Sequence, residues 1–452
     1  MTQGTENLIM KETDPYWAKF EQYAGEIRQP SWVFPLRKAG MARFAEMGFP
    51  TINHEDWRFT NVAPIARLPF HPASGSSRTS LNLANLQYLP FVGMPASRLV
   101  FVDGHFSAAL SVVLPVPAGV RVGSLAAALT TDAPLIEQHL ARYASGEGDA
   151  FTALNTAFFQ DGAFIYVPAG QTVPDPVQLL FITTSAHSGA ASLPRNLIIA
   201  GDNSRLTVVE SFLSTVDGPY FTNAVEELVI GADAVVEHCK FQDESPAAYH
   251  IAALHVRLAR RANFIAHSIA TGAKLSRNNI RTHLGAEGIE CVLNGLYVTK
   301  DEQLADHHMV VDHAKPHCNS HEYYNGILDD RSKGVFHGRI LVRPDAQKTD
   351  AKQTNKNLLL SDDATIDTKP QLEIYADDVK CTHGATVGQL NDESIFYLRA
   401  RGIGLETARQ MLIHAFAGEI IDRIRFTPVR EELDQIVWNR LEQSPVVRQQ
   451  HV

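Results

Sequence analysis

The sequence is poor in cysteine and lacks the short motifs of several enzyme classes. Its four cysteines in 452 residues are too few for a disulfide-held fold, and no two of them form a CxxC pair. It contains no GxxxxGKS/T phosphate loop, no HExxH zinc motif and no GxSxG nucleophile elbow. These absences predict a protein that has no nucleotide site of its own.

A long apolar run and an excess of basic residues are also missing. No stretch approaches the roughly 18 uncharged apolar residues of a membrane span, and the first residues lack the basic and apolar regions of a secretory signal. The 40 Lys and Arg against 50 Asp and Glu give a formal charge of −10, unlike a general nucleic-acid binder. We therefore expect a cytoplasmic chain with free thiols that binds neither membrane nor nucleic acid.

Histidine, by contrast, is abundant and unevenly placed. The chain has 19 histidines in all. Seven of them fall in one window of the sequence: His283, His307, His308, His313, His317, His321 and His337.

Local patterns divide the chain into three parts. Residues 1–160 are predicted to form a mostly helical α/β region, because apolar residues recur at helical spacing over 35–49 and over 125–158. Over 161–388 the helix signals vanish and short β-branched runs dominate. Residues 389–452 return to helical patterning.

The middle part contains an internal repeat: a short apolar strand, a tight polar or glycine-containing turn, and a second apolar strand. The second strands of six units begin near residues 206, 234, 263, 289, 335 and 365, which gives steps of 28, 29, 26, 46 and 30 residues. The long fourth step holds most of the histidine window.

A period near 28 residues without helices is typical of a β-solenoid, in which each coil buries its apolar face on the next. We therefore expect a mainly β fold, with a parallel β-helix core flanked by N-terminal and C-terminal helical regions. A β-sandwich with irregular turns is the alternative that this pattern leaves open.

Residues 306–321 combine imidazole, carboxylate and thiol groups, a mixture that can bind zinc or iron. On an extended strand, however, His308 and Val310 share one face while His307 and Met309 share the other, so the segment cannot present all its ligands together. This favours histidines that hydrogen-bond turns and cap coils.

The alternative function that the 307–321 segment suggests is a metal-dependent β-helix enzyme, such as a carbohydrate lyase or isomerase. It would use His307, His308, Asp312 and His313. This hypothesis rests on fold analogy alone.

Cys381 and His383 form a second group of interest. On a strand their side chains point to the same side, and a neighbouring imidazole can lower the pKa of a thiol and bind a soft metal with it. Gly384 follows and the repeat region ends here, so a strand edge should be open. Cys239 and Cys291 lie within strand patterns and are expected to be small buried hydrophobes.

The residues around this pair are more specific than their spacing. Ala346–Ser361, Pro370–Gly388 and Phe396–Gly402, together with Glu55–Thr60 near the N-terminus, resemble the SufB/SufD family of iron–sulfur cluster assembly proteins. The resemblance spans about residues 30–425.

Within that family the chain resembles the SufD branch. SufB proteins carry a cysteine at the place of Leu398, and SufD proteins carry the Cys-x-His-Gly-Ala-Thr run that is matched from Cys381 to Thr386. The resemblance implies a right-handed parallel β-helix with helical ends, in agreement with the repeat. It also implies a non-catalytic subunit of a complex with a SufB-like scaffold and a SufC-like ATPase.

The resemblance further implies where the partners and the cargo bind. A SufB-like subunit would pair through the β-helix edge, and the isolated chain could form a homodimer. His383 would help to build the nascent, transient cluster at that interface, with Cys381 beside it, because one imidazole and one thiol are too few for a closed cluster site. A reduced flavin is linked to such complexes, although no motif here marks its site.

An apolar stripe in the C-terminal region predicts either a packing face or a docking surface. Its residues recur at helical spacing: Leu405, Ala408, Met411, Leu412 and Phe416. The spacing alone favours packing, whereas the family resemblance implies that the C-terminal helices dock the SufC-like ATPase.

Overall fold

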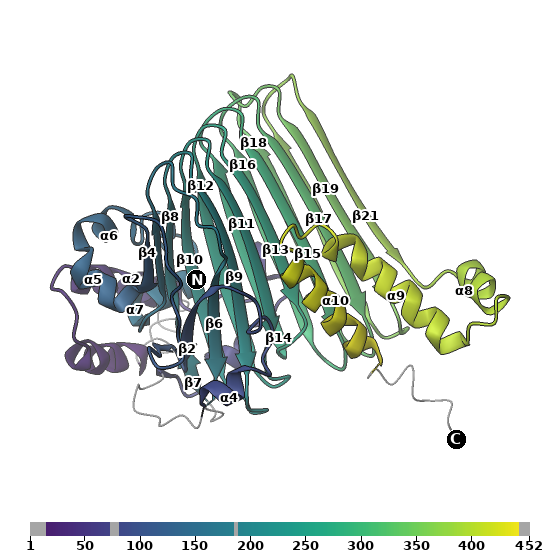
Figure 1. The fold of residues 1–452 in the computed structure, drawn as a ribbon, viewed down its shortest axis with the longest axis horizontal. Helices are drawn as coiled ribbons and strands as arrows, with labels where there is room; N and C mark the ends of the chain where they lie inside the picture. The colour runs from purple at the N-terminus through teal and green to yellow at the C-terminus, as the bar shows by residue number, and fades with distance from the viewer. Residues whose placement is uncertain (1–14, 73–80, 185–188, 443–452) are drawn as a thin grey trace, which may run out of the picture.

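Two long sheets, wound as one solenoid, form the middle of the molecule (Figure 1). The computed structural model describes residues 15–72, 81–184 and 189–442. Sheet A contains, in spatial order, β20 (Thr365–Ile374), β18 (Lys333–Val342), β16 (Leu304–His313), β14 (Leu275–Leu284), β12 (Tyr249–Leu258), β10 (Phe221–Ile230), β8 (Arg195–Ala200), β5 (Ala163–Val167) and β4 (Arg121–Ser124), with β7 (Ala190–Ser192) and β1 (His71–Pro72) at its side.

Sheet B faces it. Its spatial order is β21 (Lys380–Gly388), β19 (Asp350–Leu359), β17 (Asn319–Leu328), β15 (Glu290–Thr299), β13 (Asn263–Ala270), β11 (Val235–Asp243), β9 (Arg205–Ser214), β6 (Val177–Thr183), β2 (Ser97–Val102) and β3 (His105–Phe106). From β8 to β21 every coil adds one strand to each sheet, and all neighbours in a sheet are parallel. The predicted parallel β-helix is therefore confirmed, and the sandwich is excluded.

The coils are more regular than the sequence repeat suggested. The second strands near 206, 234, 263 and 289 correspond to β9, β11, β13 and β15 of sheet B, but those near 335 and 365 correspond to β18 and β20 of sheet A. The 46-residue step was therefore wrong, because it missed β17 and crossed from one sheet to the other. The histidine window occupies ordinary coils and not an insertion.

Tight turns join each sheet A strand to the sheet B strand that follows it. Each of these turns, from β8 to β19, contains a residue in the left-handed region: Asn203, Asp233, Arg261, Gly288, His317 and Lys348. The N–H of His317, for example, donates to Gln347 O of the next turn at 2.9 Å. Backbone hydrogen bonds thus join consecutive turns, and His317 is one of the residues that form them.

Alternate residues of both sheets point into the solenoid, where they form a continuous apolar core with Phe212, Phe264 and Phe336 among its members. Glycine makes room where the ring of the paired residue on the neighbouring strand is large. A Cβ on Gly295 would lie 2.0 Å from a ring atom of Tyr324, so only glycine fits there.

Helices cover the first end of the solenoid and one face (Figure 1). Residues 15–26 are helical. The other helices are α2 (Val33–Met47), the 3-10 helix η1 (Glu55–Trp57), α3 (Ala63–Ala66), α4 (Leu83–Leu86), α5 (Leu125–Thr131), α6 (Ala133–His139), α7 (Ala150–Phe158), α8 (Asp392–Arg399), α9 (Leu405–Ile421) and α10 (Thr427–Glu442). In Figure 1, α9 and α10 lie across sheet B, and α8 projects beyond β21.

The N-terminal motif Glu55–Thr60 is bound to the outer face of sheet A. The carboxylate of Asp306 accepts hydrogen bonds from Thr60 Oγ1 and from Arg277 Nη1, both at 2.5 Å. The guanidinium of Arg277 also lies 3.8 Å from the centre of the Trp57 ring. Since Asp306 and Arg277 are almost fully buried, this contact anchors the motif to the solenoid.

Asp306→Ala should therefore lower the free energy of unfolding by about 3 kcal/mol, because Arg277 is left as a buried charge without its carboxylate. Urea denaturation measures this loss. The matched control is Asp345→Ala, which removes an 80 % exposed carboxylate 3.9 Å from Lys315 and should change stability little. Equal losses in the two variants would contradict the anchoring role.

Candidate functional site

The solenoid has an open end at its last coil. Within the described residues, β20 and β21 each pair with one neighbouring strand and stand last in their sheets. Their side chains are exposed or half-buried, whereas the equivalent side chains of earlier coils are mostly buried. One backbone edge of each strand is therefore free to pair with another strand.

Cys381 and His383 lie on β21, on the side that faces the solenoid interior. In the β19–β21 ladder they are opposite Ala351 and Gln353, whose side chains are buried inside the solenoid. Because no further coil of the described chain covers them, His383 is exposed and Cys381 is half-buried. The two side chains thus share one face at the open end.

The Cys381 thiol packs at the edge of a small apolar cluster that contains Ile340, Val342 and Ala376. Burial raises the pKa of this thiol above its ordinary value. His383 is not among the groups that shift this pKa, and Cys381 stays protonated at neutral pH unless a metal displaces the proton.

A buried polar pair lies behind His383 inside the solenoid. Gln353 Nε2 donates to Glu322 Oε2 at 2.6 Å, and both residues are at most 1 % exposed. Burial raises the pKa of Glu322 to about 7. Gly338 of sheet A leaves space for the pair, since a Cβ there would lie 2.0 Å from Gln353 Nε2. Polar groups therefore continue from the exposed imidazole into the core.

The other three cysteines are buried. Burial raises the pKa of Cys239 and of Cys291, the latter to about 12, so both behave as the small hydrophobes that their strand positions predicted. The thiol of Cys318 donates to Ala286 O at 3.1 Å. Among the four, only Cys381 is partly accessible.

The residues of the 307–321 segment are dispersed. His307 and His313 point into the core, and His313 Nε2 lies 2.8 Å from Ser320 Oγ. His308 and Asp312 point outward, where Asp312 binds His283 and Arg343, each at 2.8 Å. The alternation predicted for this strand is confirmed, and the four ligands of the alternative enzyme are not brought together.

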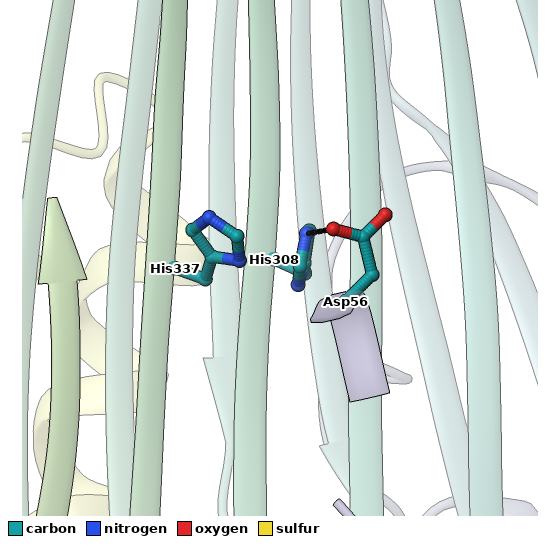
Figure 2. A group of neighbouring side chains, drawn as sticks. All are labelled: Asp56, His308 and His337. Carbon is teal, nitrogen blue, oxygen red and sulfur yellow. Dashed lines mark ion pairs between the residues drawn. The ribbon is translucent and has the colours of Figure 1, made fainter. Parts of the chain in front are cut away.

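A group that sequence reasoning missed joins the N-terminal motif to sheet A. Figure 2 shows Asp56, His308 and His337, whose ligand atoms all lie within 4.8 Å of one another. Asp56 and His308 are 252 positions apart in the sequence, so only the tertiary structure brings them together. The one feature of the sequence that pointed to Asp56 was its place in the Glu55–Thr60 motif.

Two imidazoles and one carboxylate form a set that can bind iron or zinc. Here, however, Arg277 Nη2 lies 3.1 Å from His308 Nδ1, and an arginine can only donate. A neutral His308 then carries its proton on Nε2, which faces Asp56 Oδ1 at 3.6 Å. A metal-bound histidine would instead need an acceptor at Nδ1, so the group suits docking of the N-terminal motif better than metal binding.

A second group lies inside the solenoid and contains Glu210, Glu226 and His238. His238 Nε2 lies 3.2 Å from Glu226 Oε1, and burial together with Glu226 raises the pKa of Glu210 to about 7. The adjoining cavity of about 30 Å³ is also lined by Lys240. Because the Lys240 ammonium repels a further cation, this group is best described as a buried, internally compensated ion network.

The five residues of the C-terminal stripe do not share one free face of α9. Ala408 is completely buried and Phe416 packs against the apolar cluster between the helices and sheet B. Leu405 and Leu412 are half-buried, and Met411 is 38 % exposed. The stripe thus contains both packing and accessible residues.

No helix of the described chain has the length and apolar character needed to cross a membrane.

Comparison with known proteins gives two family matches. Residues 181–416 match the SufBD core domain of the SUF system for FeS cluster assembly, and residues 10–179 match the SufBD protein N-terminal region. The chain is 32% identical over 413 residues to the iron–sulfur cluster assembly protein SufD of Escherichia coli, covering 90% of this chain and 93% of that protein. It is 33% identical over 409 residues to a SufBD family protein of Synechocystis, covering 89% of each.

Glu322→Gln should stabilise the chain above pH 7. The folded protein keeps Glu322 protonated up to about pH 7, whereas the unfolded chain releases this proton near the ordinary value of 4.5. The wild type therefore loses stability as pH rises from 4.5 to 7, by up to roughly 3 kcal/mol, and the variant does not. Urea midpoints measured across pH give the difference.

The matched control for this titration is Glu287→Gln, which changes an exposed glutamate in a neighbouring turn. Its stability should follow that of the wild type at every pH. A constant offset between Glu322→Gln and the wild type from pH 4.5 to 8 would contradict the raised pKa.

Proposed function

Because the chain belongs to the SufBD family of iron–sulfur cluster assembly proteins, we propose that it acts as the SufD-type subunit of a cytoplasmic complex with a SufB-like scaffold and a SufC-like ATPase. The observation that carries this proposal is the open last coil, which presents His383 beside an unpaired strand edge. In this role the chain contributes binding groups and no catalytic turnover of its own.

The SufB-like subunit pairs with the free edges of β20 and β21. Edge strands with unpaired N–H and C=O groups bind other strands by extending the sheet. Large apolar side chains lie exposed beside these edges, including Tyr375 at 62 % and Val387 at 50 %. A second copy of this chain would use the same edge, so a homodimer of the isolated chain competes with the heterodimer.

The nascent cluster forms as transient cargo between the two subunits. Iron–sulfur clusters need several thiolate or imidazole ligands, and this end of the chain offers the exposed His383 and the half-buried Cys381. The remaining ligands therefore come from the partner. Since the pKa of Cys381 is raised, His383 is the stronger ligand until iron displaces the thiol proton.

The SufC-like ATPase binds the C-terminal helices. Here the accessible apolar groups are Met411 on α9 and Phe396 and Tyr397 on α8, which are 74 % and 56 % exposed. Leu405 and Leu412 border this surface, while Ala408 and Phe416 hold α9 on sheet B. One side of α9 thus packs on sheet B, and the other side is available to bind the ATPase.

His383→Ala should reduce cluster assembly without unfolding the chain, because the side chain is exposed and the strand stays paired with β19. The tagged chain is co-expressed with its SufB-like and SufC-like partners, and iron and acid-labile sulfide are counted per isolated complex. We expect an intact complex with several-fold less iron and sulfide.

The matched control is Thr382→Ala, an exposed neighbour that points to the other side of β21. Unchanged iron and sulfide in His383→Ala would remove His383 from the site. A wild-type chain that never associates with the two partners would overturn the proposed function itself.

Met411→Glu should weaken binding of the ATPase roughly tenfold or more, because a charge enters an apolar contact. Thr130→Glu, at an exposed position of α5 near the first end of the solenoid, is the control. Point substitution is preferable to deletion of α9 and α10, which would uncover the buried cluster beneath them. Equal affinities of the two variants in a binding titration would place the ATPase elsewhere.

A further inference from the structure

A basic cleft of about 320 Å³ lies on the outer face of sheet A. Arg257 on β12 and Arg281 on β14 line its floor, and Arg142 with Tyr143 line its wall from the loop after α6. Residues 255 and 257 pair with 281 and 283 in the β12–β14 ladder, so these strand side chains share one face. The cleft is separate from the open end at β21.

The three guanidinium groups of this cleft have no hydrogen bond or ion pair with any residue of the described chain. Some other surface arginines have carboxylate partners, as in Arg261 with Asp233 and Arg331 with Glu302. Three unpaired cations around one cleft repel one another, in a chain whose formal charge is −10. An anion would remove this repulsion.

The carboxylates near the cleft have partners other than its three arginines. Asp312 lines it but binds Arg343 and His283. Asp149 caps the start of α7, accepting from the N–H groups of Phe151 and Thr152 at 3.1 and 3.2 Å. The local charge is therefore positive.

The loop that carries Arg142 is held in place by a buried carboxylate. Glu227, which is 0 % exposed, accepts hydrogen bonds from the backbone N–H groups of Ala141, Tyr143 and Ala144 at 2.7, 2.9 and 3.1 Å. Ala141 adopts a φ of 58°, a conformation that costs energy for a non-glycine residue. These bonds hold the backbone on both sides of Arg142 in place without a ligand.

We propose that this cleft binds a phosphorylated small molecule, with Arg142, Arg257 and Arg281 as the phosphate ligands. Planar guanidinium groups match phosphate oxygens in pairs, and three of them suit a doubly charged phosphate. The volume is at the lower end of ligand pockets and fits a mono- or diphosphate with a small organic part, whose ring can contact Tyr143. This proposal does not depend on the proposed function.

The test is isothermal titration of the full chain with inorganic pyrophosphate, ADP and flavin mononucleotide in parallel, against sulfate at equal ionic strength. We expect saturable binding of at least one phosphate probe in the micromolar range and weaker binding of sulfate, which carries less charge than pyrophosphate and has no organic part. Sulfate binding as tight as that of every phosphate probe would overturn the proposal. Equal affinities for pyrophosphate and an organic phosphate would show that the cleft recognises the phosphate groups alone. Tighter binding of the organic phosphate would show that its organic part also contacts the protein, as expected for Tyr143.

Arg142→Gln, Arg257→Gln and Arg281→Gln should each weaken that binding at least tenfold. The matched control is Arg260→Gln, an exposed arginine three positions from Arg257 that does not line the cleft. Thermal melting temperatures should not fall in any of the four variants, because none of these side chains has a hydrogen bond or ion pair in the described chain. Failure of every phosphate probe to bind, or equal affinities in the cleft variants and the control, would overturn the proposal.

Discussion

The structure depends on the backbone hydrogen bonds between successive coils. A strand of a parallel β-helix finds partners for its N–H and C=O groups only in the coils before and after it. At the first end, the antiparallel strands β4 and β3 terminate the two sheets, and α5 packs there. At the last end the ladder stops at β20 and β21 without such a closure in the described chain. The asymmetry gives the molecule one end at which another subunit can continue the sheets.

The polar groups inside the solenoid follow the same asymmetry. In the middle coils buried charges are paired, as in His238 with Glu226 at 3.2 Å and His250 with Glu244 at 2.6 Å. Nearer the open end, Glu322 has the neutral Gln353 as its hydrogen-bond partner and no cation. Burial without a cation favours the neutral carboxyl and raises the pKa of Glu322 to about 7.

The outer face of sheet A binds the N-terminal region at two places. Asp306 and Arg277 anchor the Glu55–Thr60 motif, and Glu227 on β10 fixes the loop after α6. Both contacts use buried polar groups on strands to position backbone or side chains from more than 80 residues away. The cleft with Arg142 and Arg281 lies beside these contacts, so the same contacts set the positions of the segments that line it.

Some strands and side-chain directions could be predicted from the sequence, and others could not. The alternation of His307 and His308 followed from strand geometry, because side chains two positions apart always share a face. The strand β17 was missed because its sequence, Asn-Ser-His-Glu-Tyr-Tyr-Asn-Gly-Ile-Leu, has no apolar run before its last two residues. It is a strand because β15 and β19 supply hydrogen bonds on both sides.

The sequence by itself determined the parallel β-helix, its helical ends, the family and the Cys381–His383 pair, since each is encoded in a local run of residues or a repeat. Only the tertiary structure decided which distant side chains lie together: Asp56 with His308, Gln353 with Glu322 behind His383, and Arg142 with Arg257 around one cleft. These contacts depend on coil register and on loops docked from distant segments, and neither leaves a pattern within a single stretch of sequence.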